Sequence, residues 1–84
     1  MPVVLENNPI HEIRDIHFEG KYMLLFVDER PIKVNLENVS PKLLNASDSG
    51  RNNYKISPGG YGIHWSEIDE DLSINGLIRQ SQKI

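Results

Sequence analysis

The sequence contains no cysteine and no long apolar run. Without cysteine there is no disulfide framework, no thiolate metal site and no thiol redox catalysis, and a reducing compartment such as the cytoplasm is expected. The longest apolar run, Tyr22 to Val27, is far shorter than the roughly 20 residues that cross a bilayer. The N-terminus lacks the positive charge and apolar stretch of a secretory signal. The sequence therefore predicts a cytoplasmic protein with no membrane association.

Basic residues are also scarce, with 9 Lys and Arg against 12 Asp and Glu and a net charge of −3. Nonspecific nucleic-acid binding depends on clustered Lys and Arg, so no direct contact with nucleic acid is expected. An acidic protein suits a small basic partner protein instead. At 84 residues the chain forms one domain with a thin core, which a homodimer would supplement.

The first half of the chain predicts an antiparallel three-stranded meander. Residues 1–9 combine two prolines with Glu6-Asn7-Asn8, which predicts an extended or poorly ordered arm ahead of a single domain over residues 10–84. The strands are expected at three ranges, separated by short polar turns: Ile10–Phe18, Lys21–Val27 and Ile32–Leu36. The third alternates apolar and polar residues with period two, which is typical of a strand with one buried face.

The second half predicts a short helix, a β-hairpin and a short C-terminal helix. Ser40-Pro41 offers an N-cap followed by proline at the first helical position. Residues 47–53 are polar and read as a mobile surface loop. Strands at 54–56 and 61–65 flank the turn Ser57-Pro58-Gly59-Gly60, and Trp65 is expected to anchor the core. Together these elements predict a small two-layer α+β domain.

Two groups of residues are candidates for interaction with a partner. The strand Lys21–Val27 is apolar on both faces. A helix is expected to cover one face and a partner the other. The first group of candidate interaction residues is therefore Tyr22, Leu24 and Phe26.

The second group is a run of four carboxylates beside a histidine. It consists of His64, Glu67, Asp69, Glu70 and Asp71. A metal or a general acid can be argued here, but no calcium-loop register fits. Capping of the following helix by Asp71 or Ser73 is the favoured interpretation. Alternation with Ile63 and Trp65 places His64 on an outward face.

No residue is assigned a catalytic, cofactor-binding or metal-binding role. No serine lies in a recognisable nucleophile setting, and the three histidines do not give a zinc spacing. The segment Gly59-Gly60-Tyr61-Gly62 lacks the order of a phosphate-binding loop and is interpreted as a hairpin turn.

The order R-N-N-Y-K-I-S-P-G-G-Y-G-I-H-W-S-E-I-D-E-D-L-S-I-N-G-L-I, from Arg51 to Ile78, resembles the C-terminal half of small bacterial proteins in the domain of unknown function 2442 family. The meander fits this family too, so the resemblance covers about Ile10 to Ile78. Its specific part is the G-I-x-W element with the acid-rich D-L stretch. Members commonly carry a D-G turn before the third strand, where this chain has Asp28-Glu29-Arg30-Pro31.

The resemblance implies partnership and no enzymatic activity. Members of the family are often encoded beside another small protein in pairs that look like toxin and antitoxin. The leading hypothesis is therefore a non-enzymatic protein-interaction module, the antitoxin-like member of such a pair. The alternative is a small-ligand-sensing or regulatory homodimeric domain, because the glycine-rich hairpin adjoins an aromatic residue and the carboxylate run.

Overall fold

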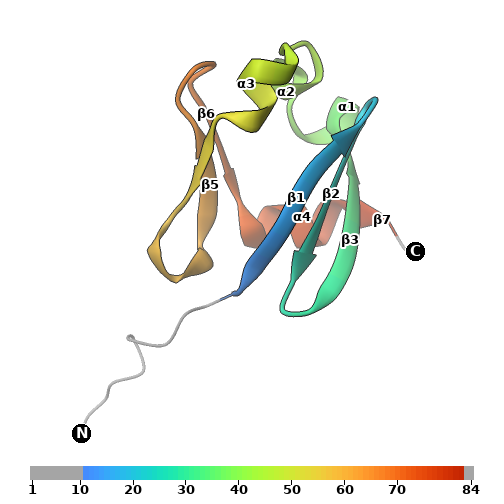
Figure 1. Ribbon diagram of the computed structural model, residues 1–84. Coiled ribbons are helices and arrows are strands. Elements are labelled where there is room, and N and C mark those ends of the chain that lie inside the picture. Colours follow the sequence, from blue (N-terminus) through green and yellow to red (C-terminus); the bar gives the residue numbers. More distant parts are fainter. Residues whose placement is uncertain (1–10, 83–84) are drawn as a thin grey trace, which may run out of the picture.

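A computed structural model describes residues 11–82 of the chain as two antiparallel sheets that face each other across a core (Figure 1). The first sheet has the order β1-β2-β3-β7, and the second has the order β4-β5-β6. The strand bounds are β1 Ile13–Glu19, β2 Tyr22–Val27, β3 Arg30–Asn35, β4 Tyr54–Ile56, β5 Gly62–Trp65, β6 Glu70–Ser73 and β7 Ser81–Gln82. The predicted α+β class, the meander β1-β2-β3 and the hairpin β4-β5 are confirmed. The arm predicted for residues 1–9 lies outside the described residues.

Short helices close the two ends of the space between the sheets. Three of them follow one another at one end: α1 Leu36–Val39, α2 Pro41–Leu44 and α3 Asp48–Asn52. A 3-10 turn, Pro58–Gly60, joins β4 to β5, and α4, Ile74–Gln80, crosses the opposite end (Figure 1). None of the described helices is long and apolar enough to span a membrane.

Polar side chains begin each α-helix, which explains why such short segments are helical. The N-cap side chain accepts a hydrogen bond from a first-turn amide in every case: Asn35 in α1, Ser40 in α2, Ser47 in α3 and Ser73 in α4. An N-cap of this kind satisfies an amide that has no partner inside the helix. The predicted cap at Ser40, and Ser73 as the cap of the last helix, are therefore confirmed.

The hairpin between β2 and β3 has a two-residue turn that lacks glycine. Val27 pairs with Arg30, so only Asp28 and Glu29 form the turn, with φ values of 54° and 68°. Positive φ at both central residues is the geometry for which Asp-Gly is preferred. The hairpin therefore stays tight although this chain has Glu29 where relatives commonly have the glycine of a D-G turn. Glu29 adopts a positive-φ conformation that suits glycine better.

A bulge in β1 explains the mixed apolar spacing of that strand. The pairing with β2 shifts between Arg14 and His17, and Asp15 within the shift has a φ of 54°. One extra residue in a strand reorients the side chains that follow it. Because of this shift the apolar residues on both sides of the bulge, Ile13, Ile16 and Phe18, all pack against the core.

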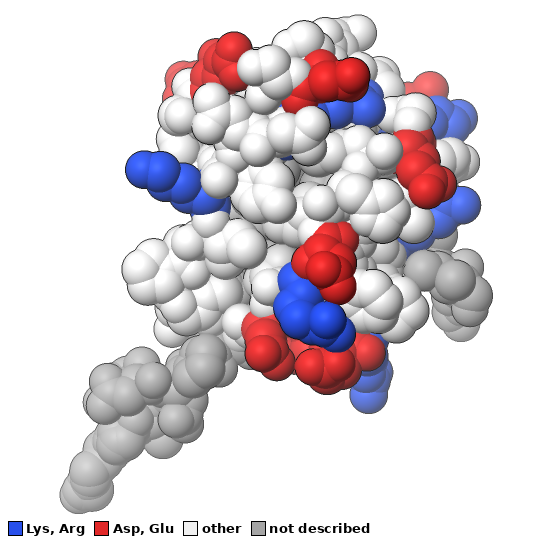
Figure 2. All heavy atoms as spheres, viewed as in Figure 1, with Lys and Arg blue, Asp and Glu red and all other residues white. Residues whose placement is uncertain are grey.

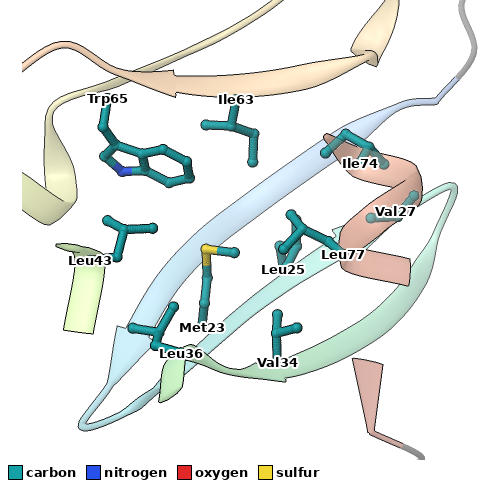
Figure 3. Close-up of a cluster of buried hydrophobic side chains, with 10 residues drawn as sticks. All are labelled: Met23, Leu25, Val27, Val34, Leu36, Leu43, Ile63, Trp65, Ile74 and Leu77. Carbon is teal, nitrogen blue, oxygen red and sulfur yellow. The ribbon is translucent and has the colours of Figure 1, made fainter. Parts of the chain in front are cut away.

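The core contains ten buried apolar side chains from both sheets and from the helices (Figure 3). They are Met23, Leu25, Val27, Val34, Leu36, Leu43, Ile63, Trp65, Ile74 and Leu77. Trp65 is fully buried, as predicted, and its Nε1 donates to the Arg51 carbonyl at 2.9 Å. The expectation of a helix over the inner face of the meander was incomplete, because β5 contributes Ile63 and Trp65 beside the helical residues.

Three local assignments from the sequence were also wrong. Leu36 begins α1 and does not extend the third strand, because the Asn35 side chain caps the chain one residue earlier. Residues 48–52, expected as a mobile loop, form α3 behind the Ser47 cap. Glu70–Ser73, expected as the approach to a helix, pairs with β5 as strand β6. In each case a contact that sequence periodicity does not report decides the local structure.

Candidate functional site

The first candidate site is the outer face of the first sheet, defined by Tyr22, Leu24 and Phe26. On β2 these three alternate with buried residues, so they point away from the second sheet and are half-buried. None of them belongs to the hydrophobic core or packs against it. Within residues 11–82, β2 makes extensive contacts with its sheet neighbours β1 and β3 alone. No described element therefore covers this row of apolar side chains.

Cations lie over both aromatic rings of the outer face. The Arg14 guanidinium carbon is 5.1 Å from the centroid of the Phe26 ring. Over Tyr22, the Nζ atoms of Lys33 and Lys21 lie 4.4 Å and 5.7 Å from the ring centroid. An ammonium or guanidinium within about 6 Å of a ring centroid is attracted by the negative face of the ring. The outer face is therefore an apolar row with a cationic side chain over the ring at each end.

Carboxylates pair with some of these cations from the rim of the outer face. Arg14 bonds to Asp15 at 3.2 Å and to Glu29 at 2.9 Å, while the Lys21 and Glu37 charges are 3.7 Å apart. These side chains are all at least two-fifths exposed, so each pair contributes about 0–1 kcal/mol. Figure 2 shows acidic and basic side chains of this kind next to one another on the surface. Such pairs exchange readily for the charges of a partner.

Glu70 turns toward the interior and takes part in the fold. The Ser40 hydroxyl is fully buried and donates to Glu70 Oε2 at 2.5 Å, while Glu70 Oε1 accepts from the Asp71 amide at 3.1 Å. The same Ser40 oxygen accepts from the Leu43 amide at 3.1 Å. Glu70 therefore fixes the hydroxyl that caps α2.

The other members of the acidic group lie on the second sheet and on its β5–β6 turn. His64 Nδ1 and Asp71 Oδ1 are 2.6 Å apart across the two strands. On the turn, Glu67 accepts from Ser49 Oγ at 3.4 Å, and the Asp69 carbonyl accepts from Lys42 at 2.9 Å. Acidic side chains gather near α3 and this turn in Figure 2.

The chemistry open to this second group is limited by its exposure. Asp71 orients the His64 imidazole through Nδ1, and both residues line an open hollow together with Ser57 and Tyr61. The His64 side chain is 44% exposed and that of Asp71 is 75% exposed. Among the described residues no group of three or more His, Cys, Asp or Glu side chains could hold a metal ion.

The two candidate groups do not form one surface. Tyr22, Leu24 and Phe26 point outward from the first sheet, whereas His64 points outward from the second sheet, and the core separates the two. In Figure 1 the strands β2 and β5 that carry them lie on opposite sides of that core. One partner segment therefore cannot contact both outward faces at once.

Sequence reasoning missed a hydrogen-bonded cluster around His11. Its Nδ1 is 2.7 Å from Asp28 Oδ2 and its Nε2 is 3.0 Å from Asn75 Oδ1. Both partner atoms are acceptors, so both ring nitrogens act as donors and the charged imidazolium is favoured. The hydrogen bonds to Asp28 and then to Asn75 raise the pKa of His11 above its usual value.

The same cluster stabilises the ionised form of Asp28. The hydrogen bond from His11, followed by one from the Glu12 amide, lowers the pKa of the Asp28 carboxyl. Asp28 lies in the β2–β3 turn and Asn75 in α4, at 17 and 64 residues from His11. No local pattern in the sequence signals contacts over such separations.

Comparison with known proteins gives a family but no function. Neither the curated proteins nor the solved structures include a match to the chain. A family model described as protein of unknown function (DUF2442) matches residues 13–83. This range begins with the first residue of β1 and includes every other described element. The chain therefore belongs to the DUF2442 family.

Proposed function

We propose that the chain is a non-enzymatic protein-interaction module that binds a small partner protein through the outer face of its first sheet. In this proposal it is the antitoxin-like member of a bacterial two-protein system and acts by covering a functional surface of the partner. The observation that carries the proposal is the row Tyr22, Leu24 and Phe26 on β2, which no element within residues 11–82 covers.

The composition of the outer face supports this role. Interfaces commonly place aromatic anchors at the centre and polar residues that exclude water around them. Here two aromatic rings flank Leu24, and charged side chains surround the row. Truncation of such an anchor typically weakens binding by about 2–4 kcal/mol.

Overall charge and local charge have separate roles in this proposal. The net charge of −3 favours long-range attraction of a basic partner, because steering depends on the whole charge distribution. Contact at the outer face depends on the nearby groups, among which Arg14 and Lys33 lie directly over the rings. The exposed Glu67 and Asp69 on the β5–β6 turn add to the steering field.

The experiment is co-purification of a tagged chain with the product of the neighbouring gene, in the native cell. Leu24→Gln is the test variant, and Ile56→Gln is the matched control, because Ile56 is a strand residue of the second sheet with 39% exposure. Leu24→Gln is expected to lose the partner while Ile56→Gln retains it. Retention of the partner by a folded Leu24→Gln chain, verified by its urea-unfolding midpoint, contradicts the proposal.

The alternative, a small-ligand-sensing domain, is favoured by the open hollow beside the β4–β5 turn. Tyr61, His64 and Asp71 line it, and they offer a ring, an oriented imidazole and a carboxylate. A ligand that binds the native chain raises its melting temperature. A metabolite that raises the melting temperature of the parent chain, but not that of His64→Gln, would support this function over the first.

A further inference from the structure

The dimensions of the outer face fit one helix. From Tyr22 to Phe26 the row covers four residue steps, or about 13 Å at 3.3 Å per residue, and three strands about 4.8 Å apart give a width of about 10–14 Å. A single α-helix is about 10–12 Å across, and about nine of its residues cover 13 Å. An apolar sheet face is normally covered by a packed helix or a second sheet. The inner face already has the second sheet, which leaves the outer face for a helix.

The cations over the rings indicate the charge of the side chains that such a helix carries. Arg14 lies over the Phe26 end of the row, and Lys21 and Lys33 lie over the Tyr22 end. The rim carboxylates of Arg14 and Lys21 belong to exposed pairs of low energy. Among residues 11–82 no carboxylate lies within salt-bridge distance of Lys33. Carboxylates of an incoming segment can therefore pair with Lys33 directly, and with Arg14 and Lys21 in exchange for their exposed partners.

We infer that the outer face binds one amphipathic α-helix of the partner, about two and a half turns long, with an apolar stripe over Leu24 and Asp or Glu residues beside the stripe. This inference rests on the proposed function and adds the chemistry of the bound segment. A partner that is basic overall presents this acidic-edged helix as its docking element. A helix edged by Lys or Arg is disfavoured, because its charges would meet Arg14 and Lys33.

The test measures binding of two designed, fluorescein-labelled helical peptides to the full chain by fluorescence anisotropy. Both are 15 residues long with the same leucine stripe, and glutamates flank the stripe in one peptide while lysines replace them in the other. The glutamate peptide is expected to bind at least tenfold more tightly at low salt, and added salt should reduce this preference. Equal affinities, or a preference for the lysine peptide, would overturn the inference.

Two pairs of variants locate the binding surface. Lys33→Glu is expected to weaken binding of the glutamate peptide about tenfold, whereas Lys55→Glu, the same change on the second sheet, leaves the affinity unchanged. Likewise Leu24→Gln should abolish binding and Ile56→Gln should not. Amide chemical-shift changes confined to the β4–β6 sheet would place the peptide elsewhere and overturn the inference.

The failure of this inference is distinguishable from the failure of the proposed function. If binding of the native partner requires Leu24 but the glutamate peptide does not bind, the proposed interaction role is supported and the inference of a bound helix is wrong. If light scattering shows a dimer of the parent chain that Leu24→Gln separates into monomers, a second copy covers the face and the helix assignment also falls.

Discussion

The contact between Ser40 and Glu70 provides a quantitative test of the fold, because one buried hydroxyl serves two interactions. Ser40 Oγ accepts from the Leu43 amide at the start of α2 and donates to Glu70 on β6. Ser40→Ala removes both at once. The matched control is Ser73→Ala, because Ser73 caps α4 by accepting from the Gly76 amide and is itself exposed.

The expected magnitudes follow from these two roles. Loss of an N-cap costs about 1 kcal/mol, so Ser73→Ala should lower the free energy of unfolding by about that amount. Ser40→Ala also removes a hydrogen bond to a part-buried carboxylate, which contributes about 1.5–3 kcal/mol. The total for Ser40→Ala should therefore be about 2.5–4 kcal/mol, well above that of the control.

The assay is urea unfolding at pH 7, followed by the fluorescence of the buried Trp65. A double-mutant cycle with Ser40→Ala, Glu70→Gln and the double variant isolates the coupling free energy between the two side chains. This coupling free energy should be at least about 1 kcal/mol. Equal costs for Ser40→Ala and Ser73→Ala, with no coupling to Glu70, would refute the placement of Glu70 inside the fold.

Three further predictions concern the turns and the histidine cluster. Gly60→Ala should destabilise the chain by more than about 2 kcal/mol in urea unfolding, because Gly60 has a φ of +72° and an added Cβ would clash with the His11 carbonyl oxygen. A cost below about 1 kcal/mol would contradict this close approach. Glu29→Gly should raise stability by up to about 1 kcal/mol, because Glu29 has positive φ in a two-residue turn, and a lower melting temperature would count against this explanation. The raised pKa of His11 predicts a stabilising contribution that is complete below about pH 6.5 and is lost as the pH rises through the folded-state pKa. The lowered pKa of Asp28 predicts a contribution that is complete above its ordinary pKa and is lost as the pH falls through the folded-state value. The free energy of unfolding, measured from pH 5 to 9, should fall at alkaline pH in the parent chain and in His17→Gln but not in His11→Gln. An unchanged pH profile in His11→Gln would refute the role of the cluster.

Local patterns in the sequence predicted those parts of the fold that depend on neighbouring residues. Period-two alternation located the strands around Ile32 and Ile63, and Ser40-Pro41 located the start of α2. The apolar run Tyr22–Val27 predicted a helix over one face and a partner over the other, and in the structure Tyr22, Leu24 and Phe26 lie on the face that no described element covers.

The remaining features depend on partners that are distant in the sequence. Glu70 was grouped with the exposed carboxylates, because its contact with Ser40 joins residues 30 positions apart. Strand β6 was missed because its acidic residues resemble the first turn of a helix, whereas its pairing with β5 decides the structure. The Arg51 guanidinium donates to the carbonyls of Gly20, Leu43 and Leu44 and lies 5.2 Å from the centroid of the Phe18 ring, which no local pattern predicts.

The order in which the two sheets are joined has a consequence for synthesis of the protein. The first sheet is completed by β7, which pairs with Lys33 and Val34 only after the whole second sheet and α4 have been made. Until β5 and α4 have been made, the core-facing side chains Met23, Leu25 and Val27 of the emerging meander lack the cover that these two elements provide. Incomplete domains with exposed apolar surface are prone to aggregation. During translation the first sheet therefore exposes apolar side chains on both faces, and a partner or chaperone that binds the outer face would shield that face before folding is complete.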